Sequence, residues 1–123
     1  MLVVDDAPSV VQVVSAALSA HCDLDIRPFI SSAGALRYCR TREPDVAVLD
    51  VCMPDLDGVT LARALRVHYP QLPIVFMTGS PADVAAAESE VRFHPPVRVL
   101  TKPARVATLV AAVRAALGVH EPL

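Results

Sequence analysis

The hydrophobic residues of this chain follow two patterns that alternate along its length. Five short runs rich in Val, Ile and Leu are typical of strands, most of them buried on both faces of a sheet. Between them, apolar residues recur at the spacing typical of amphipathic helices. The predicted strands are residues 2–4, 24–26, 46–49, 74–77 and 97–100. The first predicted helix begins at Pro8, and the other four occupy residues 33–42, 59–68, 81–91 and 105–117.

The alternation of strands and helices predicts an α/β fold. Strand–helix–strand units are right-handed, so the strands run parallel and the helices cover both faces of the sheet. We therefore expect a doubly wound, five-stranded parallel sheet with five helices. The helix predicted over residues 81–91 is rich in Ala and has few large apolar residues, namely Val84 and Val91. We expect this helix to be weakly held, because helices in proteins depend on a packed face.

Composition limits the class of protein further. The chain has 123 residues, of which 54% are hydrophobic, and this is enough for one domain with one core. A formal net charge of -2 gives no broad basic surface for nucleic acid. The apolar runs are shorter than the roughly 20 residues that a membrane-spanning helix needs. Three cysteines without paired or metal-type spacing indicate free thiols, so we expect a cytoplasmic protein.

Polar residues follow four of the predicted strands. Asp5 and Asp6 follow the first strand, and Asp50 ends the third. Thr78 follows the fourth strand and Lys102 the fifth. The carboxyl ends of parallel strands lie along one edge, where open α/β folds place their sites. Each residue also has an ordinary alternative, since Asp often caps helices or starts turns and Lys is most often solvated.

Taken in this order, the polar motifs resemble the receiver domain of bacterial two-component response regulators, and the match covers essentially the whole chain. The matching segments are Val3 to Asp6, Asp50 to Pro54 with Gly58, Thr78-Gly79 and Lys102-Pro103. The resemblance implies a flavodoxin-like sheet with strand order 2-1-3-4-5. It also implies that Asp50 accepts a phosphoryl group from a phosphohistidine on a sensor histidine kinase or a histidine phosphotransfer protein.

A carboxylate that attacks phosphorus forms an acyl phosphate, and the repulsion between two anions calls for a cation. A hard divalent ion with oxygen ligands, Mg²⁺ or Mn²⁺, suits this site. By similarity, Asp6 and Asp50 bind the metal directly, and Asp5 acts mainly through a water molecule. The backbone carbonyl of Cys52 is the implied third protein ligand. Three carboxylates, one Mg²⁺ and the Lys102 ammonium sum to about zero formal charge.

The resemblance also implies a switch. The Thr78 hydroxyl and the Lys102 ammonium would each bind a phosphoryl oxygen, and the loop and helix after the fourth strand would move with Thr78. The Lys102–Pro103 peptide bond would be cis. The residue three before the lysine, usually Tyr or Phe in the family, is Val99 here. We therefore expect altered coupling to the face formed by the fourth helix and the fifth strand.

We expect a single receiver domain over residues 1–123, with no output domain in this chain and no enzyme activity beyond self-catalysed phosphotransfer and dephosphorylation. A downstream protein or a second copy would be a further partner, without direct contact to nucleic acid or membrane. One alternative is a Mg²⁺-dependent phosphohydrolase, which normally needs an acid where this chain has Cys52. The other is a degenerate receiver that acts as an unphosphorylated scaffold. Asp55 and Asp57 are predicted to be turn residues without a role.

Overall fold

The structure, a computed structural model, describes residues 1–23, 25–93 and 97–118. These residues form one five-stranded parallel sheet in the order β2-β1-β3-β4-β5, which confirms the predicted topology. The strands are β1 (Leu2–Val4), β2 (Arg27–Phe29), β3 (Ala47–Asp50), β4 (Ile74–Thr78) and β5 (Val97–Thr101). The helices are α1 (Pro8–His21), α2 (Ser32–Cys39), α3 (Gly58–His68), α4 (Pro81–Phe93) and α5 (Val106–Ala116).

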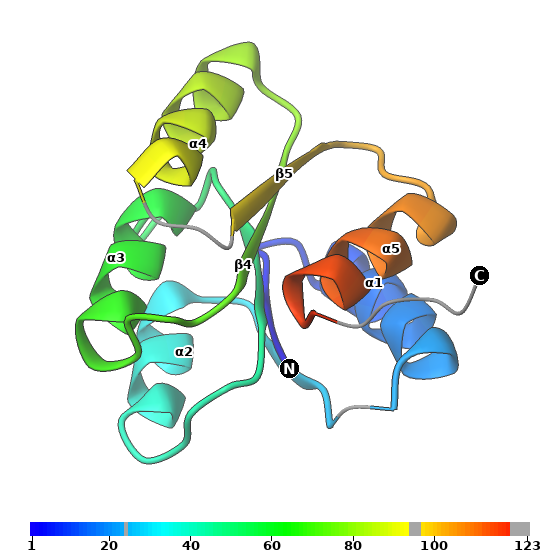
Figure 1. Cartoon of the computed structure of the whole chain (residues 1–123), viewed down its shortest axis with the longest axis horizontal. Helices are drawn as coiled ribbons and strands as arrows, with labels where there is room; N and C mark the ends of the chain where they lie inside the picture. The colour runs from blue at the N-terminus through cyan, green and yellow to red at the C-terminus, as the bar shows by residue number, and fades with distance from the viewer. Residues whose placement is uncertain (24, 94–96, 119–123) are drawn as a thin grey trace.

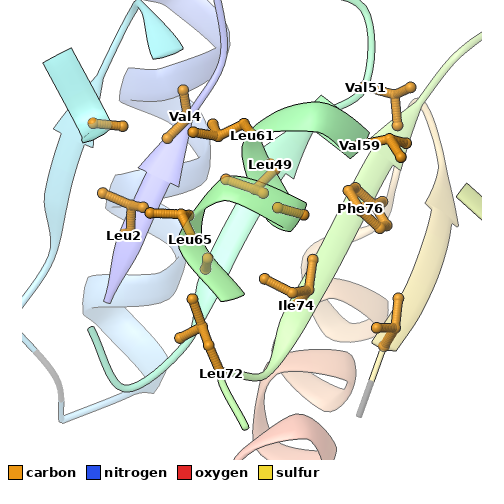
Figure 2. Close-up of a cluster of buried hydrophobic side chains, with 14 of the residues drawn as sticks. Leu2, Val4, Leu49, Val51, Val59, Leu61, Leu65, Leu72, Ile74 and Phe76 are labelled. Atoms are coloured by element: carbon orange, nitrogen blue, oxygen red, sulfur yellow. The ribbon is translucent and has the colours of Figure 1, made fainter. Parts of the chain in front are cut away.

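The helices form a layer on each side of the sheet. In Figure 1, α2, α3 and α4 cover one face, and α1 and α5 cover the other. Alternate residues of each central strand point to opposite faces, so Leu49 packs under α2 and α3 while Val48 packs under α1 and α5. Figure 2 shows the cluster on the first face, which we call the α2–α4 core; its largest members include Leu61, Leu65 and Phe76.

The second strand is displaced from its predicted position. The prediction placed it at residues 24–26, of which residue 24 lies outside the described part of the chain. The strand is Arg27–Phe29 instead, paired with β1 through a 2.8 Å bond from Arg27 N–H to the Met1 carbonyl. Pro28 made this stretch a poor strand candidate by sequence. It is tolerated because β2 is an edge strand, where a missing N–H leaves no gap in the ladder.

Helix boundaries differ from prediction mainly at α2, which ends at Cys39 and not at residue 42. The backbone N–H of the next residue, Arg40, turns back to the carbonyls of Arg37 and Tyr38. The Tyr69 hydroxyl donates a 2.6 Å hydrogen bond to the Cys39 carbonyl. Gly118 follows α5 with a φ of 74°, a backbone conformation that glycine commonly supplies after a helix end. None of the described helices is long and apolar enough to cross a bilayer.

Candidate functional site

The carboxyl edge of the sheet brings together three carboxylates from two neighbouring strands. Asp5 and Asp6 directly follow β1, and Asp50 is the last residue of β3, which pairs with β1. One carboxylate oxygen from each of the three residues lies within 4.8 Å of the others. Asp5 and Asp50 are buried, whereas Asp6 is exposed. The cluster is therefore open to solvent on the side of Asp6.

Lys102, just past β5, reaches across to this cluster. Its Nζ lies 2.8 Å from Asp5 Oδ2 and 3.2 Å from Asp50 Oδ1. Burial alone would lower the pKa of the Lys102 ammonium, but the hydrogen bond and charge of Asp5, aided by Asp50, outweigh burial and raise the pKa. The lysine is therefore a fixed positive charge at neutral pH. The Lys102–Pro103 peptide bond is cis, as the resemblance implied.

Asp5 is held by protein contacts on both of its carboxylate oxygens. Oδ1 accepts a 3.0 Å hydrogen bond from the backbone N–H of Ala7, and Oδ2 accepts the hydrogen bond from Lys102. Asp5 is only 4% exposed, so these contacts compensate the loss of its hydration. The side chain is consequently oriented by the turn between β1 and α1 and by β5 together.

The position of Asp50 disfavours a negative charge. Burial raises the pKa of its carboxyl group, and the neighbouring charge of Asp5 raises it further, while Lys102 acts in the opposite direction. The backbone behind Asp50 is tightly enclosed, because a Cβ on Gly58 would collide with the Asp50 carbonyl oxygen. Gly58 is thus required at this position for its lack of a side chain, and not for an unusual backbone conformation.

Thr78 ends β4, one residue beyond the residue that pairs with Asp50. Its backbone carbonyl accepts a 2.8 Å hydrogen bond from the Lys102 N–H, so the two residues are joined through the backbone. Its side chain is buried, and its hydroxyl oxygen accepts a 3.3 Å hydrogen bond from the N–H of Ser80. Thr78 therefore belongs to the same edge of the sheet, with its hydroxyl engaged by the following loop.

The sequence also predicted roles for Cys52, Pro103 and Val99. Cys52 is a free cysteine with an exposed side chain in the loop after β3, and the ligand role of its carbonyl stays a prediction. Pro103, next to Lys102, lines a pocket of about 310 Å³ with Val10 and Val13 of α1. Val99 is half-buried, packs against the α2–α4 core and lines a groove beside α5.

The turn assignment of Asp55 and Asp57 missed the contacts that both side chains make. Asp57 caps α3, because its carboxylate accepts hydrogen bonds from the N–H and the hydroxyl of Thr60 at 2.9 and 3.0 Å. An Asp just before a predicted helix is a known start signal, so this cap was detectable in the sequence. Asp55 accepts a 3.2 Å hydrogen bond from the N–H of Ala33, which is far away in sequence. No local pattern indicates that second contact.

Comparison with known proteins decides the family. The model of the response regulator receiver domain matches residues 1–114 of the chain. The chain belongs to the receiver domain family. Its relatives do not favour the phosphohydrolase or the scaffold alternative.

Individual relatives agree with this assignment. The receiver is 37% identical over 82 residues to the probable transcriptional regulatory protein TcrX of Mycobacterium tuberculosis, covering 67% of this chain and 35% of TcrX. It is 36% identical over 87 residues to the DNA-binding transcriptional regulator NtrC of Escherichia coli K12, covering 71% of this chain and 18% of NtrC. The crystal structure of the receiver domain of NtrX from Brucella abortus superposes with a TM-score of 0.85 at 27% identity, covering 95% of this chain and 97% of that domain.

The curated relatives are longer than the matching region. The matches span 35%, 18% and 29% of the length of the first three curated relatives. The similarity to these proteins therefore concerns their receiver portion.

Proposed function

We propose that this receiver accepts a phosphoryl group on Asp50 from a phosphohistidine of a sensor histidine kinase or a histidine phosphotransfer protein. The observation that carries the proposal is the ammonium of Lys102, which contacts Asp5 and Asp50 at once at the edge of the sheet. A buried carboxylate beside a fixed cation can act as a nucleophile toward phosphorus. Domain family and geometry thus support the same chemistry at the same residue.

The residues around Asp50 also fit a divalent cation. The three carboxylates and the single ammonium of Lys102 leave two formal negative charges, which one divalent ion would neutralise. All donors are oxygens, which Mg²⁺ and Mn²⁺ prefer. Asp6 and Asp50 would hold the ion directly, with the Cys52 carbonyl as a further ligand. Both oxygens of Asp5 already accept hydrogen bonds, which supports a contact through water for Asp5. When bound, the ion would neutralise phosphoryl oxygens.

In the proposed transfer, an Asp50 carboxylate oxygen attacks the phosphorus atom and forms an acyl phosphate. The bond from phosphorus to the donor imidazole nitrogen breaks, and its electron pair stays on that nitrogen. Lys102 would move from its carboxylate contacts to a phosphoryl oxygen, which carries more negative charge. The buried position of Asp50 keeps its carboxylate poorly hydrated, so less water has to be removed for attack.

Phosphorylation would be read out through Thr78. Its hydroxyl oxygen accepts a hydrogen bond from the Ser80 N–H, so its proton is available for a phosphoryl oxygen. A shift of Thr78 toward the phosphoryl group would displace the loop to α4 and change the surface that a downstream protein or a second copy contacts. We propose that residues 1–123 act in the cytoplasm as one receiver unit, with no catalysis beyond their own phosphorylation and dephosphorylation.

Labelling with acetyl phosphate and Mg²⁺, followed by intact mass measurement, tests the proposal. The parent chain should gain one phosphoryl group, and Asp50→Asn should gain none. Asp45→Asn is the matched control, because Asp45 is an exposed carboxylate outside the cluster. This control should be labelled like the parent. Equal labelling of Asp50→Asn and the parent would overturn the assignment of Asp50.

A further inference from the structure

The loop between β3 and α3, residues 51–57, is tied to a helix that contributes nothing else to the site. Its residue Cys52 would supply the backbone ligand for the cation. The first part of the loop is fixed by the sheet and the core. The Val51 N–H donates to the Met77 carbonyl at 3.2 Å, and the Met53 side chain is buried in the α2–α4 core. The second part lies over the amino-terminal end of α2.

Two contacts join this second part to α2. The Asp55 carboxylate accepts a 3.2 Å hydrogen bond from the N–H of Ala33, in the first turn of the helix. The Ser32 hydroxyl donates a 2.7 Å hydrogen bond to the Leu56 carbonyl. Ser32 is fully buried, so loss of this acceptor would leave a buried hydroxyl with only a 3.8 Å contact to the sulfur of Met53. We call these two contacts the α2 latch.

The charge of Asp55 lies at the amino-terminal end of α2, where a negative charge stabilises a helix. The first turn of α2 contains no acidic residue, and its cap residue Ser31 serves the N–H of Gly34. The free N–H groups at a helix start attract negative charge. The hydrogen bond from the Ala33 N–H is the main cause that lowers the pKa of Asp55, which favours its charged form. Asp55 therefore completes the cap of α2 from a different segment of the chain.

We propose that Asp55 and Ser32 are positioning residues for the divalent cation: the α2 latch fixes the loop that carries the Cys52 carbonyl. This inference rests on the proposed function, since the cation is part of it. Neither side chain would touch the ion. Without the latch, residues 54–56 would keep the packing of Leu56 against the α2–α4 core and their neighbours Met53 and Asp57, but would lose their hydrogen bonds to α2. The carbonyl two residues after Asp50 would then be held less firmly, and the cation would bind more weakly.

Mn²⁺ binding, measured by electron paramagnetic resonance of the free ion, tests the latch without relying on phosphorylation. Asp55→Ala removes both the acceptor and the charge, and we expect about ten-fold weaker binding, the lower end of the loss seen for outer-shell partners. Asp55→Asn keeps an amide oxygen as acceptor and should recover most of the affinity. Asp57→Asn removes one charge from the same loop but keeps a capping side chain, so its affinity should stay within about two-fold of the parent.

Ser32→Ala supplies an independent test from the helix side of the latch and should also weaken Mn²⁺ binding. Circular dichroism checks that each variant is folded at the temperature of the titration. At saturating Mg²⁺, the labelling rate of Asp55→Ala by acetyl phosphate should return to within about two-fold of the parent, because the latch acts on cation affinity. Equal Mn²⁺ affinity of Asp55→Ala and Asp57→Asn would overturn the latch, whereas a parent chain that binds no Mn²⁺ would overturn the proposed function.

Discussion

Two neighbouring helices on the same face of the sheet, α3 and α4, are held very differently. Helix α3 buries Val59, Leu61 and Leu65 in the α2–α4 core (Figure 2). Among the side chains of α4 that the structure describes, only Ala87 is buried. Since burial of apolar area stabilises a helix in place, we expect α3 to be anchored more firmly than α4. Among the described side chains of this face, burial therefore decreases from α3 to α4.

The two helices also follow loops with different proposed roles in the site. The loop before α3 carries the proposed cation ligand, and the loop before α4 follows Thr78, the proposed phosphoryl sensor. A cation site requires ligands that hold still, whereas a switch requires an element with two arrangements of similar energy. A groove of about 860 Å³ borders β5 and α5 next to α4, and its lining includes Val99 and Ala111. The side of α4 thus borders free space, and Glu88 of α4 is part of the lining.

The largest expected effect tests the gradient directly by truncating one side chain on each helix. Leu61→Ala removes a fully buried side chain of α3 and should cost about 2–5 kcal/mol in the free energy of unfolding. Val84→Ala removes a half-buried side chain of α4 and should cost less than about 1 kcal/mol. Denaturant unfolding of both variants and the parent measures the difference. Similar losses for the two variants would show that α4 is anchored as firmly as α3.

The weak hold on α4 stays a prediction from the sequence, and it depends on residue types within each helix. Residues 81–91 are rich in Ala, whereas α3 contains several Leu residues, and this contrast is visible in the sequence. The same holds for the cluster of Asp5, Asp50 and Lys102, since a parallel sheet gathers the carboxyl ends of its strands. These features follow from periodicity and topology alone.

The parts that could not be predicted depend on contacts between distant segments. The position of β2 is set by pairing with β1 and by its place at the edge, which makes Pro28 harmless. The carbonyl of Cys39, the last residue of α2, accepts a hydrogen bond from the hydroxyl of Tyr69, 30 residues further on. The contact from Asp55 to Ala33 spans 22 residues. Local pattern carries no signal for such contacts, because each partner has an ordinary role in its own segment.

The second prediction concerns Asp50, which lies before the loop to α3 and whose charged form is disfavoured by burial. Its pKa is raised chiefly by burial and then by Asp5, so the ionised carboxylate destabilises the folded state. In metal-free buffer at neutral pH, Asp50→Asn should raise the free energy of unfolding by on the order of 1 kcal/mol. Thermal unfolding with a chelator present measures the change. Added Mg²⁺ should stabilise the parent more than the variant.

The pH dependence of this gain has a definite sign. Because the pKa of Asp50 is higher in the folded than in the unfolded chain, the folded state binds more protons in the window between the two values. As pH falls through that window, the parent therefore gains stability from this group. The advantage of Asp50→Asn should shrink on acidification and be largest above the folded-state pKa. If the stability advantage of Asp50→Asn grew as pH falls, the pKa of Asp50 would not be raised in the folded state.

The smallest expected effect tests whether the groove beside β5 is open. Val99→Phe adds a ring at a half-buried position that lines the groove, so we expect a change in unfolding free energy within about 1 kcal/mol. Val75→Phe is the matched control in the neighbouring strand β4, where the side chain is fully buried and overpacking should cost about 1–3 kcal/mol. Thermal unfolding of both variants measures the difference. If Val99→Phe were as costly as Val75→Phe, the groove would be closed in solution. The loose packing of α4 would then have to be explained without free space at its border.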